Sequence, residues 1–318
     1  MNVTSQDVAV QAGVSRGTVS QILNGHASRF ASETVDRVRR AAAELDYQPS
    51  IAGRTLARGS SDIIIALIPN TTFGGNLQDL FERVTDELAE HGLMLVLRMA
   101  TASTAALDRL VSGLRPAAVV SMTRLTDQER EVLAARDVNV LEPSAPTQSD
   151  VLDEIGALQA RTLIEYGYTR LAFAHLRDAR EDPFGESRER AVRAVCRDAG
   201  IADPVVLSLG IDRSEAAAAL DALGDPGAAV ACYNDDVAMA LLAAATARRW
   251  RVPQQLALIG MDCTPLSQLT EPALTTIAYD YETAVRLMTA GVLAMLGYET
   301  FEQSQEAPVL QLVEGGTV

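Results

Sequence analysis

Short apolar runs alternate with longer amphipathic stretches through most of this 318-residue chain, from residue 63 to residue 259. The run at residues 63–68 is continuous and rich in isoleucine, which is typical of a parallel strand buried on both faces. The alternation breaks near residues 142–150, which are rich in Pro, Ser and Thr, and then resumes with the same rhythm. The pattern therefore predicts two α/β halves, each with helices packed on a parallel sheet.

The individual elements follow from the same periodicity. Strands are expected at residues 63–68, 94–98, 117–121, 138–141, 171–174, 205–209, 228–231 and 256–259. Helices are expected at residues 77–91, 105–114, 127–136, 153–166, 187–199, 214–223, 236–249 and 283–296. Apolar residues make up 48% of the chain and aromatic residues only 4%, which suits alanine- and leucine-rich helices on a buried sheet.

The first fifty residues lack this alternation and predict three short helices instead. Thr4 and Asp7 form a capping-box pattern that opens the first helix. Ser15 follows a glycine turn and is expected to cap the second helix, as Ser32 is expected to cap the third. A compact helical head of this size is therefore expected ahead of the two α/β halves.

Charge is divided unevenly between this head and the rest of the chain. The formal net charge is −15, yet residues 1–60 hold seven arginines against five acidic residues. The remaining residues hold 20 basic and 37 acidic side chains. Because an anionic body repels DNA, the mildly cationic head is the part of the chain suited to contact nucleic acid.

Few side chains suit a metal site, a cofactor or catalysis. The three cysteines and three histidines lie far apart and lack metal-binding spacing. No predicted strand is followed by a nucleophile elbow, and the sequence has no P-loop or dinucleotide-binding glycine pattern. Asp235 and Asp236 could form an acid pair, but helix N-termini attract acidic residues for electrostatic reasons alone. We therefore expect no cofactor, no metal ion and no enzyme activity.

The location of the protein is suggested by two further features. No apolar stretch approaches the length that spans a bilayer. Residues 1–11 lack the basic start and apolar stretch of a signal peptide. We expect a cytoplasmic protein without membrane contact.

Ordered motifs in the head and the body carry a family resemblance. The head contains VTSQDVA at residues 3–9, AGVSRGTVS at residues 12–20 and LDYQPS at residues 45–50. The body contains CYND at residues 232–235 and IGMD at residues 259–262. In this order the motifs resemble the lactose/galactose repressor (LacI/GalR) family of bacterial transcription regulators, over nearly the whole chain.

The resemblance implies an α/β protein in which a small all-α helix-turn-helix head and a hinge helix join a two-lobed core like that of periplasmic binding proteins. It implies a DNA-binding domain at residues 1–48, a hinge helix and linker at residues 49–60, and an effector-binding and dimerisation domain at residues 61–318. A homodimer would bind a pseudo-palindromic double-stranded DNA operator. A small-molecule effector between the lobes would control operator binding, with repression as the expected outcome.

The second helix of the head is the expected reader of the operator. Its first turn would enter the major groove, where base edges differ in their donors and acceptors. Arg16, Gly17 and Gln21 match the family's base-reading positions; Arg16 suits guanine and Gln21 suits adenine, whereas Gly17 offers no side chain. The residues expected to contact phosphates are Thr4, Ser15, Thr18, Ser20 and Asn24. The plain alternative is that Arg16 and Ser20 are solvated surface residues.

Arg54 and Leu56 belong to the segment that resembles the family's hinge helix, and both are expected to contact DNA. The resemblance implies that Leu56 wedges between base pairs in the minor groove and kinks the operator. A leucine packed on the core is the alternative. Gly53 stands where alanine is common in the family and costs a helix about 0.5–1 kcal/mol. We therefore expect the hinge to fold only on operator DNA.

The resemblance also implies an effector site between the lobes. Arg188, Asn234 and Asp262 match the family's motifs there. Arg188 and Asp262 together offer donors and a charged acceptor to sugar hydroxyls, and an ion pair between them is the alternative. The other expected effector contacts are Asn70, Phe73, Glu142, Tyr279 and Tyr281. Of these, Glu142 and Phe73 could equally cap or pack.

A carbohydrate is the first expectation for the effector. The loop after residues 205–209 carries Ile211 and lacks the aromatic ring that the family often stacks on a sugar. A nucleoside, a purine or a phosphorylated metabolite therefore stays open, and so does the choice between an inducer and a co-repressor. A ligand receptor without DNA function is the alternative from another class, against which the head motifs argue.

Overall fold

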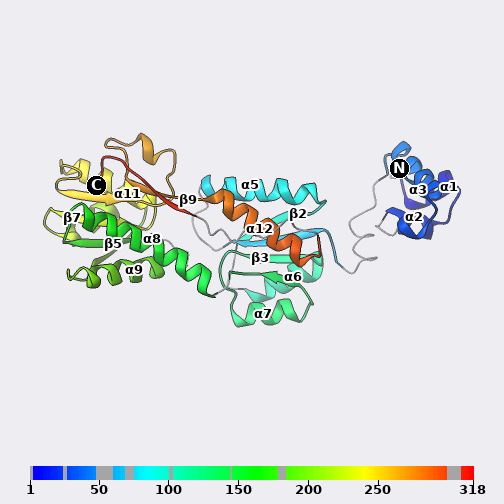
Figure 1. Cartoon of the computed structure of the whole chain (residues 1–318), viewed down its shortest axis with the longest axis horizontal. Helices are drawn as coiled ribbons and strands as arrows, with labels where there is room; N and C mark the ends of the chain where they lie inside the picture. Colours follow the sequence, from blue (N-terminus) through cyan, green and yellow to red (C-terminus); the bar gives the residue numbers. More distant parts are fainter. Residues whose placement is uncertain are drawn as a thin grey trace.

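The computed structural model places the elements in a helical head and two α/β lobes (Figure 1). The structure describes residues 3–23, 27–47, 60–68, 75–99, 103–143, 145–177, 184–298 and 309–318. In the described residues, no helix is both long enough and apolar enough to cross a membrane.

In its described residues, the head has three helices and one short turn around a common apolar core. These elements are α1 (Ser5–Ala12), α2 (Arg16–Leu23), η1 (Ala27–Arg29) and α3 (Ser32–Glu44). Val8, Val19 and Val38 are fully buried where the three helices meet. The expected cap of the third helix is wrong by one residue, because Ala31 is the N-cap and Ser32 already has helical geometry.

Lobe 1 is built on a parallel sheet in the order β2-β1-β3-β4. Its strands are β1 (Ile63–Ile68), β2 (Met94–Met99), β3 (Ala118–Ser121) and β4 (Asn139–Leu141). Its helices are α5 (Gly75–Glu90), α6 (Thr104–Leu114), α7 (Asp127–Ala134) and α12 (Tyr281–Met295). Successive side chains of β1 alternate between the faces, so Ile64 packs with α5 and α12 while Ile65 packs with α6 and α7.

Lobe 2 repeats this arrangement with a parallel sheet in the order β6-β5-β7-β8. Its strands are β5 (Leu171–Leu176), β6 (Val205–Leu209), β7 (Ala228–Cys232) and β8 (Leu256–Ile259). Its helices are α8 (Ala145–Glu165), α9 (Gly185–Asp198), α10 (Arg213–Leu223) and α11 (Asp235–Ala247). Helices α8 and α9 cover one face of the sheet, and α10 and α11 cover the other.

The described elements run from one lobe to the other three times. It leaves lobe 1 after β4 and enters lobe 2 along α8, and it returns through β9 (Thr276–Tyr279) to α12, which packs in lobe 1. The antiparallel partner of β9, β10 (Leu310–Val313), then leads the tail back to lobe 2. There the Thr317 hydroxyl donates to the Leu258 carbonyl at 2.7 Å. Neither lobe is therefore one continuous stretch of sequence.

The predicted two α/β halves are present, with two departures. The expected break at residues 142–150 is shorter than predicted, because α8 already begins at Ala145. Proline is tolerated in the first turn of a helix, so a proline near the start of this segment did not exclude one. The pair formed by β9 and β10 was not expected, since its partners are far apart in sequence.

Candidate functional site

The second helix of the head presents a polar surface. Val19 and Ile22 face the core, which leaves Arg16, Gly17 and Gln21 exposed. The Arg16 Nε donates to the Ser5 hydroxyl at 3.1 Å, so a residue of α1 contacts the guanidinium group of Arg16. The expected base-reading residues thus lie together on one exposed helix surface.

The entry to this helix is fixed by local hydrogen bonds. The Ser15 hydroxyl accepts from the Thr18 backbone N–H at 3.0 Å, which is the predicted cap, and lies 2.9 Å from the Thr18 hydroxyl. In α1 the Asp7 carboxylate accepts from the Thr4 backbone N–H at 2.8 Å and from its hydroxyl at 2.7 Å. These bonds lower the pKa of Asp7.

The remaining DNA-binding candidates divide into two groups. Ser20 is half-buried on α2 and has a polar interaction within the protein. Asn24, Arg54 and Leu56, and with them the predicted hinge helix, lie outside the described residues. The expectation that the hinge folds on DNA therefore stays a prediction.

Arg188 lies on α9 and is buried in lobe 2, with 7% of its surface exposed. Its Nη1 donates to the Tyr233 carbonyl at 2.5 Å, and its guanidinium carbon lies 5.1 Å from the centre of the Tyr233 ring. Its Nε has no hydrogen-bond partner among the described residues. The charge of Arg188 lowers the pKa of Asp262, but among the described residues no ion pair joins the two side chains, so the alternative of a direct salt bridge is not formed. A buried guanidinium with an unused donor is costly unless it binds something.

Asp262 follows β8 and contacts lobe 1. Its φ of +105° is a conformation that residues other than glycine rarely adopt. The Asn76 side-chain amide on α5 donates to its carbonyl at 2.5 Å, and the Tyr281 hydroxyl at the start of α12 donates to its Oδ1 at 3.4 Å. Burial raises the pKa of Asp262 to about 7, although the charge of Arg188 lowers it. Asp262 is therefore a point where the two lobes meet in polar contact.

Tyr279 and Tyr281 stand beside this contact. Their rings pack edge to face with centres 5.1 Å apart. Burial raises the pKa of Tyr279 to about 12 and raises that of Tyr281 further. Both hydroxyls are thus neutral donors at physiological pH.

Asn234 and Asp235 begin α11, directly after β7. The Asn234 side-chain carbonyl accepts from the Val237 backbone N–H at 3.0 Å and caps the helix. Asp235 is fully buried, and its carboxylate accepts from the Thr276 hydroxyl at 2.5 Å and from the Thr264 backbone N–H at 2.7 Å. Neutral donors from the loop after β8 and from the first residue of β9 therefore hold this carboxylate.

The structure gives Asp235 a role that the sequence reasoning missed. Considered only as half of an acid pair, it joins the site loops of lobe 2 instead. The neighbouring Asp236 is half-buried, and its pKa is raised by burial and by the charge of Asp235. The signal available in the sequence was an acid between a buried strand and a helix with no basic residue nearby.

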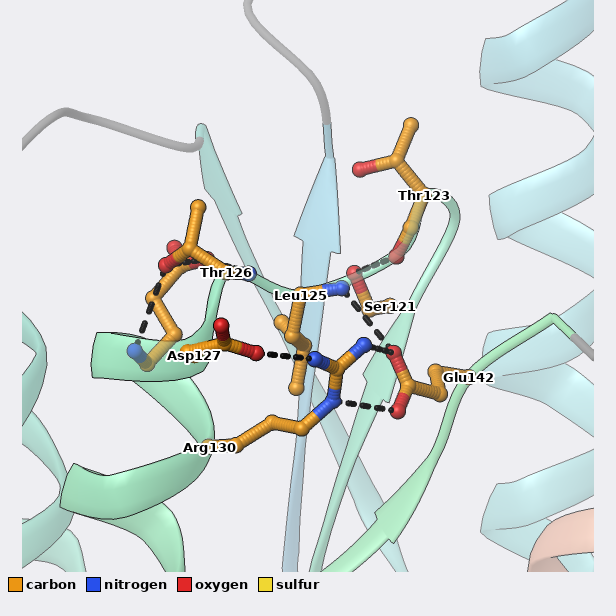
Figure 2. A network of polar contacts seen from close by, with 8 residues as sticks. Ser121, Thr123, Leu125, Thr126, Asp127, Arg130 and Glu142 are labelled. Carbon is orange, nitrogen blue, oxygen red and sulfur yellow. Dashed lines mark hydrogen bonds and ion pairs between the residues drawn. The ribbon is translucent and has the colours of Figure 1, made fainter. Parts of the chain in front are cut away.

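Glu142 lies at the end of β4 in lobe 1 and faces Arg130 of α7 (Figure 2). The Arg130 Nε donates to its Oε1 at 3.0 Å and Nη2 to its Oε2 at 3.1 Å, while the Leu125 backbone N–H donates to Oε2 at 2.9 Å. These bonds hold the pKa of Glu142 below its usual value. Both carboxylate oxygens are thus engaged within lobe 1, so the capping and packing alternative accounts for them without an effector.

The predicted effector residues are only partly brought together. The charge of Arg188 lowers the pKa of Asp262, and the charges of both residues act on the pKa of Tyr281. Asn234 adjoins the Tyr233 carbonyl that Arg188 binds. Asn70 and Phe73 lie outside the described residues. Asn76, a few residues beyond them, was missed because a polar residue at a helix start reads as an ordinary cap.

Two family models match this chain. The model described as "Bacterial regulatory proteins, lacI family" matches residues 4–50, and the one described as "Periplasmic binding protein-like domain" matches residues 160–318. The chain belongs to the LacI family. It is therefore a DNA-binding transcription regulator with an effector-binding domain, and LacI-family regulators are not enzymes. The alternative of a ligand receptor without DNA function is wrong.

Known transcription regulators resemble the chain over most of its length. It is 29% identical to the HTH-type transcriptional regulator DegA of Bacillus subtilis, over 92% of this chain and 91% of DegA. It is 27% identical to the HTH-type transcriptional repressor PurR of Vibrio vulnificus, over 86% of each chain. It is 26% identical to the HTH-type transcriptional repressor CytR of Escherichia coli, over 86% of this chain and 84% of CytR.

Two solved structures share the LacI-family fold along its whole length. The lac repressor dimer bound to operator and the anti-inducer ONPF has a TM-score of 0.76 at 21% identity and covers 100% of this chain and 99% of its own. The transcriptional regulator CelR in complex with cellobiose has a TM-score of 0.67 at 22% identity and covers 100% of both chains. The likeness supports the head and two-lobed core described above.

Proposed function

We propose that this protein is a homodimeric repressor whose grip on a pseudo-palindromic operator is controlled by a small molecule bound between its lobes. The proposed domains are residues 1–48 for DNA binding, residues 49–60 for the hinge and linker, and residues 61–318 for effector binding and dimerisation. A dimer suits such an operator because each head can occupy one half-site. The lac repressor, which has the same fold, is a dimer on its operator in the structure cited above.

The observation that carries the effector site is the environment of Arg188. Its guanidinium is buried, makes one bond to a backbone carbonyl and keeps an unused Nε donor among the described residues. Asp262 supplies a nearby acceptor. Burial raises the pKa of its carboxyl to about 7, although the charge of Arg188 lowers it. A small molecule that offers both acceptors and donors would satisfy both groups.

The link from the effector to DNA is proposed to pass through Asp262. Two lobe 1 residues, Asn76 and Tyr281, bond this residue of lobe 2. A ligand that draws the Asp262 carboxylate toward Arg188 competes with the Tyr281 contact and changes how the lobes pack. The ligand acts only through the difference in its affinity for the two arrangements. The pose of lobe 1 then decides whether the two hinge segments can meet on DNA.

On the operator, Arg16 and Gln21 are proposed to read base edges from the exposed surface of α2, with Gly17 leaving one base step unread. Thr4, Ser15, Thr18, Ser20 and Asn24 would contact phosphates, and Arg54 and Leu56 would act in the minor groove. These assignments rest on the motif match and on the exposure of the α2 surface.

A sugar is proposed as the effector, because hydroxyl groups match the mixture of donors and acceptors around Arg188 and Asp262. Asn234, Tyr279 and Tyr281 are proposed to add further contacts, and Asn70, Phe73 and Glu142 are proposed on the family resemblance alone. Ile211 is 55% exposed and offers no aromatic ring to a pyranose. A nucleoside, a purine or a phosphorylated metabolite acting as co-repressor is the second candidate, because Ile211 stands where an aromatic ring would stack on a sugar.

The test is a gel shift with full-length protein, a labelled duplex from upstream of its own gene, and excess nonspecific DNA. Cellobiose, simple sugars, nucleosides and purine bases are then titrated. Specific binding that one compound weakens makes the protein an inducible repressor, and binding that a compound strengthens makes that compound a co-repressor. Absence of specific binding under all conditions overturns the proposal.

The same assay tests the role of Arg16. If it reads a guanine, Arg16→Ala weakens binding by roughly 1–3 kcal/mol and relaxes preference at one base pair. An equal loss on every sequence would make it a phosphate contact.

A further inference from the structure

We propose that Gln159 is a positioning residue for the effector site, which holds the loops that carry Asn234 and Asp262 at a fixed distance. The inference rests on the effector site proposed above. Nothing in the motif match assigns a role to this residue, and its position within a long amphipathic stretch predicts only a helical side chain.

Gln159 is a polar residue in an apolar place. It lies on α8, with none of its surface exposed, against the carboxyl ends of β7 and β8. Its Nε2 donates to the Cys232 carbonyl at 2.8 Å and to the Gly260 carbonyl at 3.0 Å, and the Ile259 carbonyl lies 3.4 Å away. One side-chain amide therefore joins two strands that end beside each other.

These bonds begin where the ladder between β7 and β8 stops. The last paired residues of the two strands are Ala231 and Ile259, so the Cys232 and Gly260 carbonyls lie just beyond the ladder. The side-chain amide of Gln159 therefore extends the hydrogen bonding between the two strands by one position. Its orientation follows from chemistry, because the reversed amide would set an oxygen against carbonyl oxygens that cannot donate.

The position of this rung connects it to the site. Asn234 is two residues beyond Cys232, and Asp262 is two residues beyond Gly260. Between these points the Asp235 backbone N–H donates to the Met261 carbonyl at 2.9 Å. Gln159 therefore fixes both loops where they leave the strands. The bond from Asp235 to Met261 joins the two loops further along.

The same turn of α8 also fixes Arg188. A Cβ at Gly156 would overlap the Arg188 carbonyl oxygen, so glycine is required for α8 to approach α9 this closely. Gly156 and Gln159 are three residues apart and lie on one side of the helix. A single helical turn therefore positions the backbone of Arg188 and, through the carbonyls, the loops of Asn234 and Asp262.

Helix α8 also connects lobe 1 to lobe 2, so the turn with Gly156 and Gln159 can relate the effector site to the position of the lobes. Helix α8 follows β4 of lobe 1 and is the first element of lobe 2. A shift of the crossing segment at its start is transmitted along a rigid helix to the residues that shape the site. Gln159 thereby couples the geometry of the effector loops to the relative position of the lobes.

The test uses full-length protein and hydrogen exchange measured by mass spectrometry, with no ligand. Gln159→Leu keeps the volume of the side chain and removes its donors. We expect the amides of residues 232–236 and 260–264 to exchange about tenfold faster than in the wild type, because the carbonyls lose their buried partner. Gln159→Glu has the same shape and, when ionised, no donor, and we expect the same result.

Leu163→Ala is the matched control. Leu163 lies one turn further along α8 and is fully buried in the lobe 2 core, so its truncation destabilises the lobe without removing the amide. We expect exchange at the two loops to stay at the wild-type rate relative to the rest of lobe 2. Wild-type exchange in Gln159→Leu, or equal acceleration in Leu163→Ala, overturns the proposal.

This measurement separates the inference from the proposed function. If the gel-shift panel yields an active compound, that compound should bind Gln159→Leu about tenfold more weakly than it binds the wild type. Unchanged affinity for the compound despite loosened loops would overturn the positioning role. Failure of every compound on the wild type would count against the effector site instead, while the exchange result still decides whether Gln159 holds the loops.

Discussion

The two lobes share one strand order and differ in how charge is treated at the ends of their strands. In lobe 1, Glu142 is held by a two-point ion pair with Arg130 and a backbone N–H, and its pKa is lowered. In lobe 2, Asp235 is buried among neutral donors, and Asp262 has its pKa raised to about 7. The same fold thus carries an ion-paired carboxylate at the strand ends of lobe 1, whereas among the described residues the carboxylates of Asp235 and Asp262 in lobe 2 have no ion pair. Recognition is expected to concentrate in lobe 2.

The largest expected effect is a difference in effector affinity between a variant of Arg188 in lobe 2 and a variant of Glu142 in lobe 1. Arg188→Met removes a buried charged donor and should weaken effector binding about 100-fold, since hydrogen bonds to charged groups are worth roughly 1.5–3 kcal/mol. Glu142→Gln should change it less than about threefold, because Arg130 already engages that carboxylate. Isothermal titration with the compound found by gel shift measures both. Equal losses would mean that lobe 1 contributes as much as lobe 2, and the contrast would fail.

The second effect is a pH dependence of opposite sign in the two lobes. The fold favours protonated Asp262, so its stabilising contribution is complete below its ordinary pKa and is lost as the pH rises through about 7. Asp262→Asn should therefore be more stable than the wild type by about 2 kcal/mol near pH 8, with the gap closing toward pH 4. Urea unfolding across this range measures it.

Glu142 supplies the contrasting profile. Its lowered pKa means that its contribution is present above the ordinary value of 4.5 and disappears as the pH falls below it. Glu142→Gln should be less stable than the wild type at neutral pH and equal to it in acid. A stability gap of the same sign for both variants at pH 8 would contradict the comparison.

The smallest effect compares two glycines. A Cβ at Gly260 in lobe 2 would overlap the Asp235 carboxylate, which other bonds hold in place. At Gly291 on α12 in lobe 1, the nearest atom is the end of the Leu141 side chain at 2.9 Å, which can move. Gly260→Ala should cost about 1–3 kcal/mol of unfolding free energy, and Gly291→Ala about 1 kcal/mol less than that. Urea unfolding decides, and a reversed order would show that lobe 2 has the looser edge.

The sequence predicts this molecule best where function is local. The head is identified by contiguous motifs, and its cap at Ser15 and exposed Arg16 lie as the pattern indicates. The strands are also predictable, because each is a short apolar run. Arg188 and Asp262 were found through motifs that lie near the ends of their own elements.

What could not be predicted depends on contacts between distant residues. The pairing of β9 with β10 joins residues about thirty positions apart, and no periodicity encodes it. Glu142 was assigned to the effector because nothing in its own segment shows that Arg130 lies opposite. Asn76 and Gln159 are ordinary helical residues until the packing of the lobes places them beside Asp262 and the strand ends.

The threefold passage of the chain between the lobes has a consequence for synthesis on the ribosome. The core of lobe 1 includes Val285 and Val292 of α12. This core cannot be completed until α12 is synthesised, more than one hundred residues after β4. Lobe 2 is completed later still, since Thr317 donates a hydrogen bond to Leu258 of β8. The head is complete by residue 47 and emerges first. A nascent chain of this protein therefore carries a finished DNA-binding unit well before either lobe can close its core.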